Sequence, residues 1–531
     1  MQSPFDVLNN YPQHDGTLHG VFQSRCAVKG DAPFLVQGQT TLGWTQFAQR
    51  TERLAQAFAA RGITHGSRVA IIARNDAAHV LTLFALARLG AIMVPSNPDF
   101  GDRELRYVLK HADVQGVIAE QGVLDTVRPI MQALDVVPWL LVTDAEPSDR
   151  ESFQGAIDAA SHHPLASRGQ ASDTCIIIYT SGTTGFPKGV MHSQRNLVTA
   201  GEANVARLHL QPEDRILIIL PFFHVNAIFY SLGGTLAAGA CMILVKRFSA
   251  STFWQDAADQ GATVVNVIDA IGTILCARDR SEYRSDHRLR IAYGVRRAAA
   301  PTFRKDFRIN QLYSGFGMSE IPGVTCNPYG GADKPGSMGK IGVHPDPARP
   351  WAQCRVVDDN GLDVDDDVPG ELWVRHPIVM QGYFRDPEQT ASSFEGDWFK
   401  TGDIVRRDMD GFFFHLSRKK DLIRRRGENI SAVELETVIG EHPGVVECAA
   451  IAVPSELGED DILVAVVAKP GEAVTEAAIA QWCRERLAAI KVPRYVALLE
   501  ELPHTPTHKI AKAALRANPE VLNKAVDFQR G

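Results

Sequence analysis

Short apolar runs alternate with amphipathic stretches over the first four hundred residues. The run at residues 68–72 predicts a buried strand, and residues 92–94 predict the next one. Between them, Asp76 can cap a helix that runs through Leu89 and ends at Gly90. This order is a βαβ unit. Since further apolar runs follow at residues 216–220, 241–245 and 263–268, we expect an α/β fold with parallel sheets flanked by helices.

The pattern changes after about residue 400. Residues 412–416 predict an aromatic strand, and a dense cluster of charges follows at residues 418–421. The last hundred residues contain one clear amphipathic helix, with Thr475 as its N-cap. Its apolar face comprises Ile479, Trp482, Cys483 and Leu487. We therefore expect an N-terminal domain at residues 1–417 and a C-terminal domain at residues 418–531.

Composition narrows the class of protein. At 531 residues the chain exceeds what one hydrophobic core usually supports, and 45% apolar with 22% charged residues is typical of soluble globular proteins. A net charge of -7 argues against nucleic-acid binding. The first residues form no secretory signal and no apolar run is long enough to span a membrane, so we expect a cytoplasmic protein that can be an oligomer. The eight cysteines form no C-x-x-C pair, which favours reduced thiols.

A loop rich in glycine and hydroxyls directly follows the apolar run at residues 175–178. It reads Y-T-S-G-T-T-G-F-P-K-G from Tyr179 to Gly189. Glycines let backbone N–H groups approach an anion, and Lys188 adds a mobile positive charge. A Walker A motif would need glycine where Pro187 stands and a hydroxyl at Gly189. The loop therefore indicates ATP handling of another kind, and the alternative is a plain surface turn.

This loop resembles the signature [YF]-T-S-G-[ST]-T-G-x-P-K-G of the adenylate-forming superfamily, which includes acyl-CoA synthetases, luciferases and peptide-synthetase adenylation domains. The resemblance implies a large N-terminal domain of sheets flanked by helices and a small, mobile α+β lid domain. It also implies that the loop holds the phosphates of ATP through Thr180, Ser181, Gly182, Thr183, Thr184, Gly185 and Lys188.

A second motif starts at Gly315. It begins like a dinucleotide fingerprint, but Glu320 stands where the third glycine would be required, so the Rossmann interpretation fails. It resembles the superfamily motif [YF]-G-x-[ST]-E. The resemblance implies that Phe316 stacks on adenine, that Ser319 meets the α-phosphate and that Glu320 binds Mg²⁺, with Thr184 adding its hydroxyl. The nucleotide-binding residues predicted here are Gly315, Phe316, Gly317, Met318 and Ser319.

Three shorter matches follow. Asp403 belongs to a T-G-D turn and, with Arg418, matches the pair that holds the ribose hydroxyls. Lys420 occupies the hinge position about which the lid rotates in the superfamily. Arg426 and Gly427 match a segment near the pantetheine tunnel, where arginines could contact the phosphates of CoA. A solvated basic face is an equally good interpretation of those arginines.

Residues 502–510 resemble the superfamily's L-P-x-T-x-x-G-K-[IL]. Lys509 falls on the lysine that steadies the carboxylate and the α-phosphate during adenylation. His508 replaces the usual glycine, and Lys512 replaces the arginine commonly found three residues after the lysine. The first difference removes a flexible position from the loop.

The segment at residues 220–230 borders the acyl site in the superfamily. His224 matches a histidine that gates access of CoA, and the aromatic residues Phe222, Phe223, Phe229 and Tyr230 belong either to the core or to the acyl pocket. The segment has no aspartate for a substrate ammonium, which disfavours amino acids. The chain as a whole looks most like the crotonobetaine/carnitine-CoA ligase branch, although R-R-A-A-A-P at residues 296–301 replaces the usual S-G-A-A-P.

The resemblance implies an AMP-forming acyl-CoA ligase that uses ATP, Mg²⁺ and coenzyme A on a small carboxylic acid. The likeness to the crotonobetaine/carnitine branch adds the hypothesis that this acid carries a quaternary ammonium, which aromatic faces can hold. The catalytic residues would be Lys509, Glu320, Lys188 and His224. The alternatives are transfer to a carrier protein, oxygenation as in luciferases, an aryl or fatty acid as substrate, and a non-catalytic binding protein. The last would be expected to have lost Glu320 or Lys509.

Overall fold

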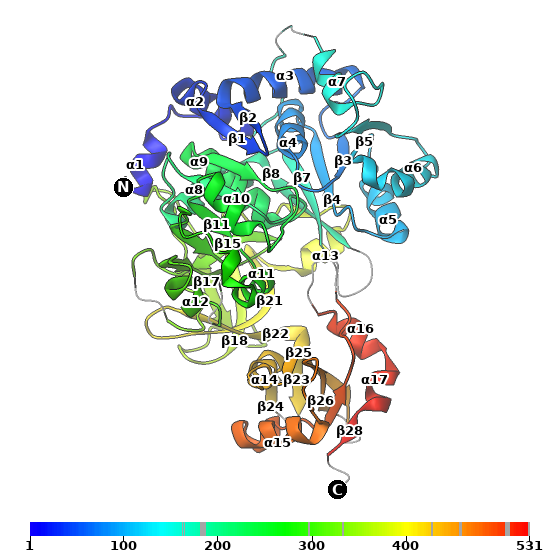
Figure 1. Cartoon of the computed structure of the whole chain (residues 1–531), viewed down its shortest axis with the longest axis vertical. Coiled ribbons are helices and arrows are strands. Elements are labelled where there is room, and N and C mark those ends of the chain that lie inside the picture. Colours follow the sequence, from blue (N-terminus) through cyan, green and yellow to red (C-terminus); the bar gives the residue numbers. More distant parts are fainter. Residues whose placement is uncertain are drawn as a thin grey trace. The chain divides into compact units, whose positions relative to one another are not determined.

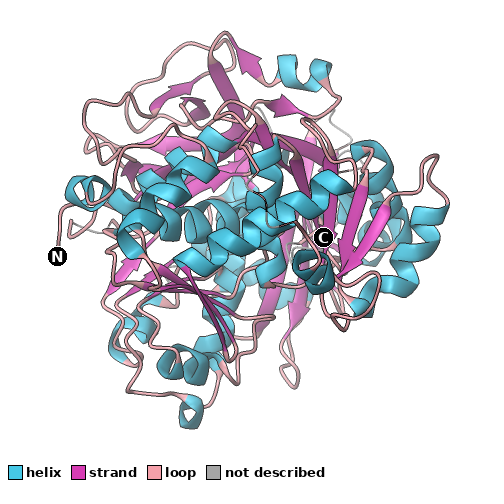
Figure 2. Ribbon diagram, turned by 90° about the horizontal axis from the view of Figure 1, so that it is seen from above, coloured by secondary structure: helices cyan, strands magenta, loops and turns pink. Residues whose placement is uncertain are grey.

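The chain divides into two compact units. The computed structural model describes residues 1–161, 163, 165–180, 187–295, 298–331, 334–425, 428–455, 459–504 and 510–528, without the side chains of residues 269, 420, 428 and 429. The first unit comprises residues 1–354 and 374–399, and the second comprises residues 355–373 and 400–531. Figure 2 shows helices and strands mixed throughout, which confirms the expected α/β class. The predicted boundary between residues 417 and 418 stays a prediction.

One seven-stranded sheet of the first unit carries the predicted βαβ segment. Its order is β19 (Gly382–Tyr383), β8 (Lys188–Ser193), β7 (Thr174–Thr180), β4 (Ile92–Ser96), β3 (Arg68–Ile72), β5 (Gly116–Ala119) and β6 (Trp139–Val142). The five strands from β7 to β6 are parallel, whereas β8 is antiparallel to both β7 and β19. The sheet is therefore parallel at its centre, and the β7–β8 hairpin lies next to its edge strand β19.

The helix between β3 and β4 is α4 (Ala77–Leu89). The side chain of Asp76 accepts a hydrogen bond from the amide of Ala78, and Gly90 ends the helix in the left-handed conformation, as the sequence predicts. All residues from Ala78 to Leu89 are buried. A helix buried around its whole circumference needs a mostly apolar sequence, and α4 has one apart from His79, Thr82 and Arg88.

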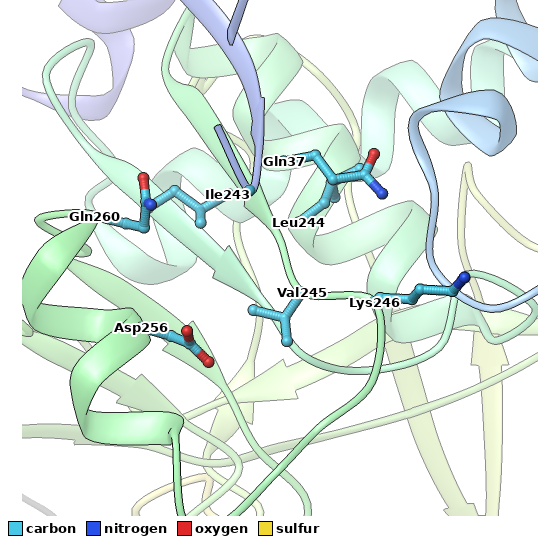
Figure 3. Close-up of a pocket in the computed structure, with 8 residues that line it drawn as sticks. Gln37, Ile243, Leu244, Val245, Lys246, Asp256 and Gln260 are labelled. Atoms are coloured by element: carbon cyan, nitrogen blue, oxygen red, sulfur yellow. The ribbon is translucent and has the colours of Figure 1, made fainter. Parts of the chain in front are cut away.

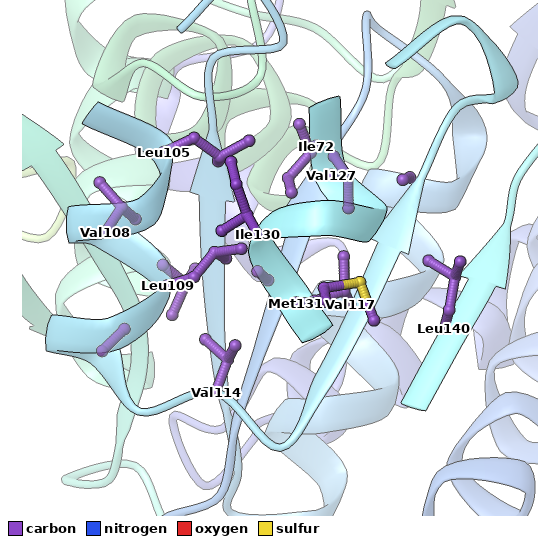
Figure 4. Packing of buried hydrophobic residues seen from close by; sticks show 14 of the residues in the cluster. Ile72, Leu105, Val108, Leu109, Val114, Val117, Val127, Ile130, Met131 and Leu140 are labelled. Carbon is purple, nitrogen blue, oxygen red and sulfur yellow. The ribbon is translucent and has the colours of Figure 1, made fainter. Parts of the chain in front are cut away.

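Helices α5 (Asp102–Ala112) and α6 (Leu124–Gln132) cover one face of this sheet (Figures 1 and 4). Their apolar side chains, among them Leu105, Leu109 and Ile130, meet every second residue of the strands, such as Ile72 and Val117. This alternation follows from the two-residue period of a strand. Burial of these side chains is the main source of stability for this half of the unit.

A second seven-stranded sheet follows the order β13 (Gln311–Tyr313), β12 (Ile291–Tyr293), β11 (Val264–Asn266), β9 (Arg215–Ile218), β10 (Cys241–Leu244), β1 (Pro33–Gln37) and β2 (Thr40–Gly43). All neighbours are parallel except β1 and β2. The predicted runs at residues 216–220, 241–245 and 263–268 correspond to β9, β10 and β11.

The remaining elements of the first unit connect or flank these sheets. Helix α8 (Gln194–Leu208) follows β8, and a π-helix, η2 (Asn226–Leu232), runs directly into α9 (Gly233–Ala238). An antiparallel sheet is formed by β14 (Gly315–Met318), β15 (Ile321–Cys326) and β16 (Lys340–Ile341). The other helices are α1 (Pro4–Asn9), α2 (Leu18–Lys29), α3 (Trp44–Ala60), α7 (Phe153–Asp158), α10 (Phe253–Asp259), α11 (Asp269–Ala277), α12 (Ala300–Lys305) and α13 (Pro387–Ser392).

Residues 353–418 form a sheet with the order β17 (Gln353–Val357), β18 (Gly370–Arg375), β21 (Trp398–Arg407) and β20 (Phe394–Glu395), in which β22 (Phe413–Arg418) also pairs with β21. A hairpin follows, made of β23 (Leu422–Arg425) and β24 (Glu428–Ser431). The last sheet has the order β25 (Val445–Pro454), β26 (Asp460–Ala468), β27 (Tyr495–Leu498) and β28 (Val526–Asp527).

This last sheet has apolar clusters formed by alternating residues of its strands. One includes α14 (Ala432–Gly440) and α15 (Glu476–Arg486), and the other includes α16 (Lys512–Ala517) and α17 (Pro519–Lys524). Thr475 caps α15 by accepting from the amide of Ala478, as predicted, and Ile479 and Cys483 are buried. The second unit therefore has a core of its own. Across the described ranges, every helix is too short or too polar to cross a membrane.

Candidate active site

Strand pairing brings Lys188, Tyr383 and Glu320 together in the first unit. Lys188 begins β8, and Tyr383 lies on the neighbouring β19. Next to Tyr383, the amide of Phe384 donates to the carbonyl of Gly189 at 2.7 Å. The Tyr383 hydroxyl donates to Oε1 of Glu320 at 2.7 Å. Nζ of Lys188 lies 5.3 Å from the centre of the Tyr383 ring, close enough for a cation–π contact. One tyrosine thus contacts both the acidic and the basic residue of the site.

Lys188 and Glu320 do not form an ion pair with each other in the described part of the chain. The ammonium of Lys188 donates instead to Oε1 of Gln389 at 2.6 Å. Burial and the neighbouring Glu320 carboxylate raise the pKa of Tyr383 far above its ordinary value of 10, so its hydroxyl stays protonated and donates. The lysine charge and the carboxylate therefore both remain available for a ligand.

The turn that carries Glu320 is fixed by a buried histidine. His192 on β8 is fully buried, and its Nε2 lies 2.7 Å from the carbonyl oxygen of Ser319. Burial lowers the pKa of His192 to about 4, so the ring is neutral at physiological pH. The amide group of Asn196 donates to Nδ1 at 3.1 Å, which leaves Nε2 as the donor to Ser319. Met380 adds a backbone bond of 2.8 Å to the carbonyl of Glu320.

The donor set suits a cation that keeps water or phosphate ligands. No group of three or more His, Cys, Asp or Glu side chains within the described residues could hold a metal ion. Glu320 has one oxygen on Tyr383 and a second, Oε2, that accepts no hydrogen bond from the described residues. Mg²⁺ is commonly bound through one or two carboxylates together with substrate phosphates. The residues present therefore fit Mg²⁺ only in the company of a phosphate ligand.

The predicted phosphate loop is bracketed by described strands. Thr180 ends β7 and is the register partner of Lys188, so the loop closes a hairpin. The rest of the predicted phosphate contacts, Ser181, Gly182, Thr183, Thr184 and Gly185, lie outside the described residues. Their roles stay predictions.

Residues 315–319 form β14 and the turn after it. Gly315 pairs with Cys326, Phe316 with Thr325 and Met318 with Ile321. Phe316 is buried, whereas Gly317 is exposed and lies opposite the bulge in this hairpin. Ser319 and Glu320 form the connection to β15. Stacking of Phe316 on adenine and contact of Ser319 with a phosphate stay predictions.

The aromatic residues around His224 mostly belong to the interior. Phe222 stacks on His79, Phe229 packs against His192 and Tyr230 packs against Arg207. Of the four aromatic residues, only Phe223 is half-exposed. The centre of its ring lies 4.6 Å from the centre of the His224 ring. The alternative of an aromatic core therefore describes Phe222, Phe229 and Tyr230, and the gating role of His224 stays a prediction.

The predicted ribose pair is adjacent in the second unit. Asp403 and Arg418 are register partners on β21 and β22. Oδ1 of Asp403 accepts from Nε of Arg418 and from Nε2 of His415, each at 2.9 Å. Oδ2 is buried and has no partner among the described residues. Gly402 has φ +69°, a conformation that glycine adopts freely, and this turn aims Asp403 into the sheet.

The other predicted positions of the second unit lie outside the described residues. These are the side chain of Lys420 and all of Arg426, Gly427 and Lys509. The segment around Lys509 is flanked by an antiparallel bridge between His504 and Ile510. The hinge, CoA-binding and catalytic roles of these residues stay predictions.

The sequence analysis missed Tyr383, Gln389 and His192. Asp386 and Pro387 signal the start of α13, since Asp386 caps it, but they do not indicate that Tyr383 meets Glu320. That contact depends on the pairing of β19 with β8, which are separated by nearly two hundred residues. A histidine on an apolar strand is ordinarily a core residue, and no local signal distinguishes His192.

A pocket of about 320 Å³ lies elsewhere in the first unit, at the ends of β1 and β10 (Figure 3). Gln37, Lys246, Asp256 and Gln260 are its polar lining residues. The side-chain amide of Gln37 donates to Asp76 and accepts from the first backbone amide of α4. Nζ of Lys246 lies 3.5 Å from Oε2 of Glu120. None of the predicted site residues lines it, so we do not associate it with the site.

Comparison with known protein families matches both the N-terminal and the C-terminal part of the chain to AMP-binding enzymes. Residues 22–384 match the family described as AMP-binding enzyme, and residues 434–509 match the AMP-binding enzyme C-terminal domain. A sulfoacetate–CoA ligase of Cupriavidus necator is 30% identical over 95% of this chain and 98% of its own. An indoleacetate–CoA ligase of Aromatoleum aromaticum is 31% identical, covering 90% and 92%.

One solved structure and one further relative are similar along most of the chain. ATP-bound MatB from Rhodopseudomonas palustris has a TM-score of 0.83 at 28% identity and covers 94% of this chain and 98% of its own. A crotonobetaine/carnitine–CoA ligase of Proteus mirabilis, the branch suggested by the sequence, is 29% identical over 89% of this chain and 92% of its own. From the match over residues 22–384 and the CoA ligases aligned along nearly the full length, the chain belongs to the AMP-binding enzyme family and is an acyl-CoA synthetase.

Proposed function

We propose that the protein is an ATP-dependent, AMP-forming acyl-CoA ligase for a small carboxylic acid. In the first step a carboxylate oxygen attacks the α-phosphorus of ATP, the bond to the β-phosphate breaks, and pyrophosphate leaves. In the second step the sulfur of CoA attacks the carbonyl carbon of the acyl-adenylate and AMP leaves, while the thiol proton passes to solvent. The products are acyl-CoA, AMP and diphosphate.

The observation that carries the proposal is the grouping of Lys188, Tyr383 and Glu320. Lys188 stands at the end of a glycine-rich hairpin, where its charge can stabilise the departing pyrophosphate. Glu320, held by the Tyr383 hydroxyl at 2.7 Å, offers its second oxygen to a cation. Mg²⁺ would supply charge neutralisation on the phosphates when it is bound. The site therefore contains a positive and a negative side chain that bind neutral partners, Gln389 and Tyr383, and do not pair with each other in the described part of the chain.

The Asp403 and Arg418 pair supports recognition of the nucleotide. Oδ2 of Asp403 is a buried acceptor without a partner among the described residues. An unsatisfied buried acceptor lowers the stability of the folded protein, and a ligand that donates to it removes this cost in free energy. The vicinal hydroxyls of a ribose are donors of this kind. We assign this pair to the ribose of ATP on the strength of the T-G-D resemblance.

The remaining roles rest on the resemblance alone. We assign Phe316 to adenine, Ser319 to the α-phosphate and the loop residues to the phosphates, with Thr184 joining Glu320 at the metal. We assign His224 to gating of CoA, Lys420 to the hinge, Arg426 and Gly427 to CoA, and Lys509 to adenylation. The full loop set is Thr180, Ser181, Gly182, Thr183, Thr184, Gly185 and Lys188.

The names of the relatives do not identify the acid that this protein activates, because they refer to different acids. Some act on an acid with a second anionic group, sulfoacetate or oxalate, and others on indoleacetate or on crotonobetaine and carnitine. A betaine-like acid therefore remains one candidate among small acids. The cytoplasm is the compartment we propose, because ATP and CoA are available there.

The test is a panel of carboxylic acids with purified protein, ATP and Mg²⁺, assayed with and without CoA. We expect acid-dependent release of pyrophosphate and, with CoA, equimolar AMP and a thioester that mass spectrometry detects. Glu320→Gln serves as the matched inactive variant, since it keeps the size of the side chain and removes the charge. Pyrophosphate release that gives a thioester only with a phosphopantetheinylated carrier protein would contradict the CoA assignment. No pyrophosphate with any acid would contradict the proposal as a whole.

A further inference from the structure

Arg207 occupies an unusual position in the first unit. It lies in the last turn of α8, and its guanidinium sits over two tyrosine rings, 5.1 Å from the centre of Tyr230 and 6.0 Å from that of Tyr293. These rings come from η2 and β12. The side chain is half-buried. The Tyr230 hydroxyl also accepts a hydrogen bond from the guanidinium. A guanidinium has five N–H donors, so contacts with two rings and one hydroxyl leave it the capacity to bind an anion.

No carboxylate of the described residues forms an ion pair with Arg207. Two buried arginines of this unit, Arg25 and Arg88, differ from Arg207 in having oxygen partners. Nη2 of Arg88 pairs with Oε1 of Glu52 at 3.0 Å, and Arg25 donates to the carbonyls of Leu236 and Ala237. A positive charge removed from water without a counter-charge is unfavourable. An anion that arrives beside Arg207 would offset that cost.

Arg207 and Tyr230 lie against the hairpin that carries Glu320. A Cβ atom placed on Gly323 would lie 2.1 Å from Nη2 of Arg207, and one placed on Gly317 would lie 2.4 Å from the hydroxyl oxygen of Tyr230. The two glycines stand three residues before and three residues after Glu320. Three residues span at most about 10 Å of chain. Arg207 therefore contacts the same hairpin that carries Glu320, at a position three residues from it along the chain.

None of the described residues that these contacts place beside the guanidinium carries a negative charge. Burial and the charge of Arg207 lower the pKa of His376 to about 3, so this neighbour is neutral. Tyr230 and Tyr293 keep their protons, because burial raises the pKa of both phenols above the usual 10. The local field is positive, with hydroxyl donors next to it. Such a field favours an anionic group and repels a quaternary ammonium.

We propose that Arg207 determines specificity by binding a second anionic group of the acid, so that the preferred substrates are short acids with two negative charges, a dicarboxylate or a carboxylate with a sulfonate. This inference rests on the proposed ligase function. It extends that function by giving the class of acid. It also replaces the betaine hypothesis, since a trimethylammonium group would meet the guanidinium.

The test compares short acids with different distal groups. Malonate and sulfoacetate carry a second negative charge, butyrate ends in an uncharged methyl group, and carnitine, a longer acid, carries a quaternary ammonium. The readout is kcat/KM for pyrophosphate release without CoA, so that the result does not depend on the acceptor. The wild-type protein should prefer a dianion to butyrate by at least tenfold. The two dianions distinguish a carboxylate from a sulfonate as the group that is bound.

Two variants assign the preference to the side chain. Arg207→Met should lower the dianion-to-butyrate ratio by at least tenfold, and Arg207→Lys should retain part of it, because charge survives while the planar fork is lost. Arg195→Met is the matched control, since Arg195 is exposed at the other end of the same helix. A structural role would lower all activities in proportion and leave the ratio unchanged, which would overturn the inference.

The substrate preference of the wild-type protein tests the inference even if Arg207→Met does not fold. A wild-type protein that prefers butyrate or carnitine would overturn the inference and leave the ligase assignment intact. Failure of the ligase assignment has a different signature, namely the absence of a CoA thioester from an acid that does release pyrophosphate.

Discussion

A single hydroxyl orients the carboxylate that we assign to the metal. Tyr383 donates to Oε1 of Glu320 at 2.7 Å while its ring carries the ammonium of Lys188. Because the phenol is buried beside a carboxylate, its pKa is raised and it never competes as an anion at physiological pH. At the scale of single residues, the site thus depends on one donor that selects which oxygen of Glu320 faces the ligand.

Tyr383→Phe tests this role, because it keeps the ring under Lys188 and removes the donor. An oxygen of a buried carboxylate is then left unsatisfied, at a cost of about 1–3 kcal/mol, and Glu320 is free to turn. We expect kcat/KM for pyrophosphate release to fall about tenfold and the Mg²⁺ concentration for half-maximal rate to rise. Mg²⁺ titrations of the wild-type protein and the variant measure both quantities.

Tyr283→Phe is the control for the loss of a phenol hydroxyl. Tyr283 contacts His287 and the rings of Trp254 and Phe307, away from the strands that carry the site. We expect its Mg²⁺ dependence to match that of the wild-type protein. An unchanged Mg²⁺ dependence in Tyr383→Phe itself would refute the orienting role of the hydroxyl.

At the scale of elements, helices α8 and α9 approach each other closely in the first unit. Gly201 of α8 faces Gly233, the first residue of α9, and a Cβ atom on Gly201 would lie 2.3 Å from the carbonyl oxygen of Gly233. Backbone atoms cannot move aside as the end of a side chain can. Because η2 leads directly into α9, this contact also sets the position of Tyr230 relative to Arg207.

Gly201→Ala should therefore destabilise the first unit. Alanine favours a helix over glycine by about 1 kcal/mol, but overpacking at a rigid contact costs about 1–3 kcal/mol, and the clash with a carbonyl makes the second effect the larger. We expect a lower apparent Tm at a fixed scan rate. Gly122→Ala, at a position with open space around the added methyl group, is the control and should leave the Tm nearly unchanged. Equal Tm values for both variants would contradict the tight contact.

Local signals were sufficient to predict the elements between residues 68 and 96. The N-cap at Asp76, the ending at Gly90 and the flanking strands all depend on neighbours in the sequence, and all are confirmed. Thr475 as a cap is confirmed for the same reason. Pairing over long distances has no such signal. The contact of Tyr383 with Glu320 requires β19 to add to β8, and a local apolar pattern does not specify a partner strand.

The aromatic stripe at residues 222–230 shows a second limit. Helical spacing groups Phe222, Phe229 and Tyr230, but residues 226–232 form a π-helix, whose wider turn changes which side chains share a face. Those rings pack against His79, His192 and Arg207. Arg207 itself gave no signal, because an arginine in the last turn of a helix is ordinary. That no carboxylate of the described residues pairs with it depends on the fold and not on its neighbours in the sequence.

At the scale of the whole molecule, the proposed chemistry is divided between two units. Lys188 and Glu320 belong to the first unit, and Asp403, Arg418 and Lys509 belong to the second. Each unit has its own apolar clusters. A reaction in two steps can use residues of the second unit in one step only, as the superfamily resemblance implies for Lys509.

Lys509→Ala tests this division of labour, because the charged contact that it removes is proposed to act in the adenylation transition state alone. Pyrophosphate release from acid and ATP should slow by two orders of magnitude or more. Thioester formation from synthetic acyl-adenylate and CoA should persist, since the carboxylate is already joined to the α-phosphate in that substrate and Lys509 is assigned to the formation of this bond. Rapid-quench assays of the two half-reactions measure the two rates separately. Lys524→Ala, which removes an exposed lysine near the same end of the chain, should leave both rates at the wild-type level. If Lys509→Ala slowed both half-reactions equally, Lys509 would have to act in both steps or support the fold, and the assignment to adenylation would be abandoned.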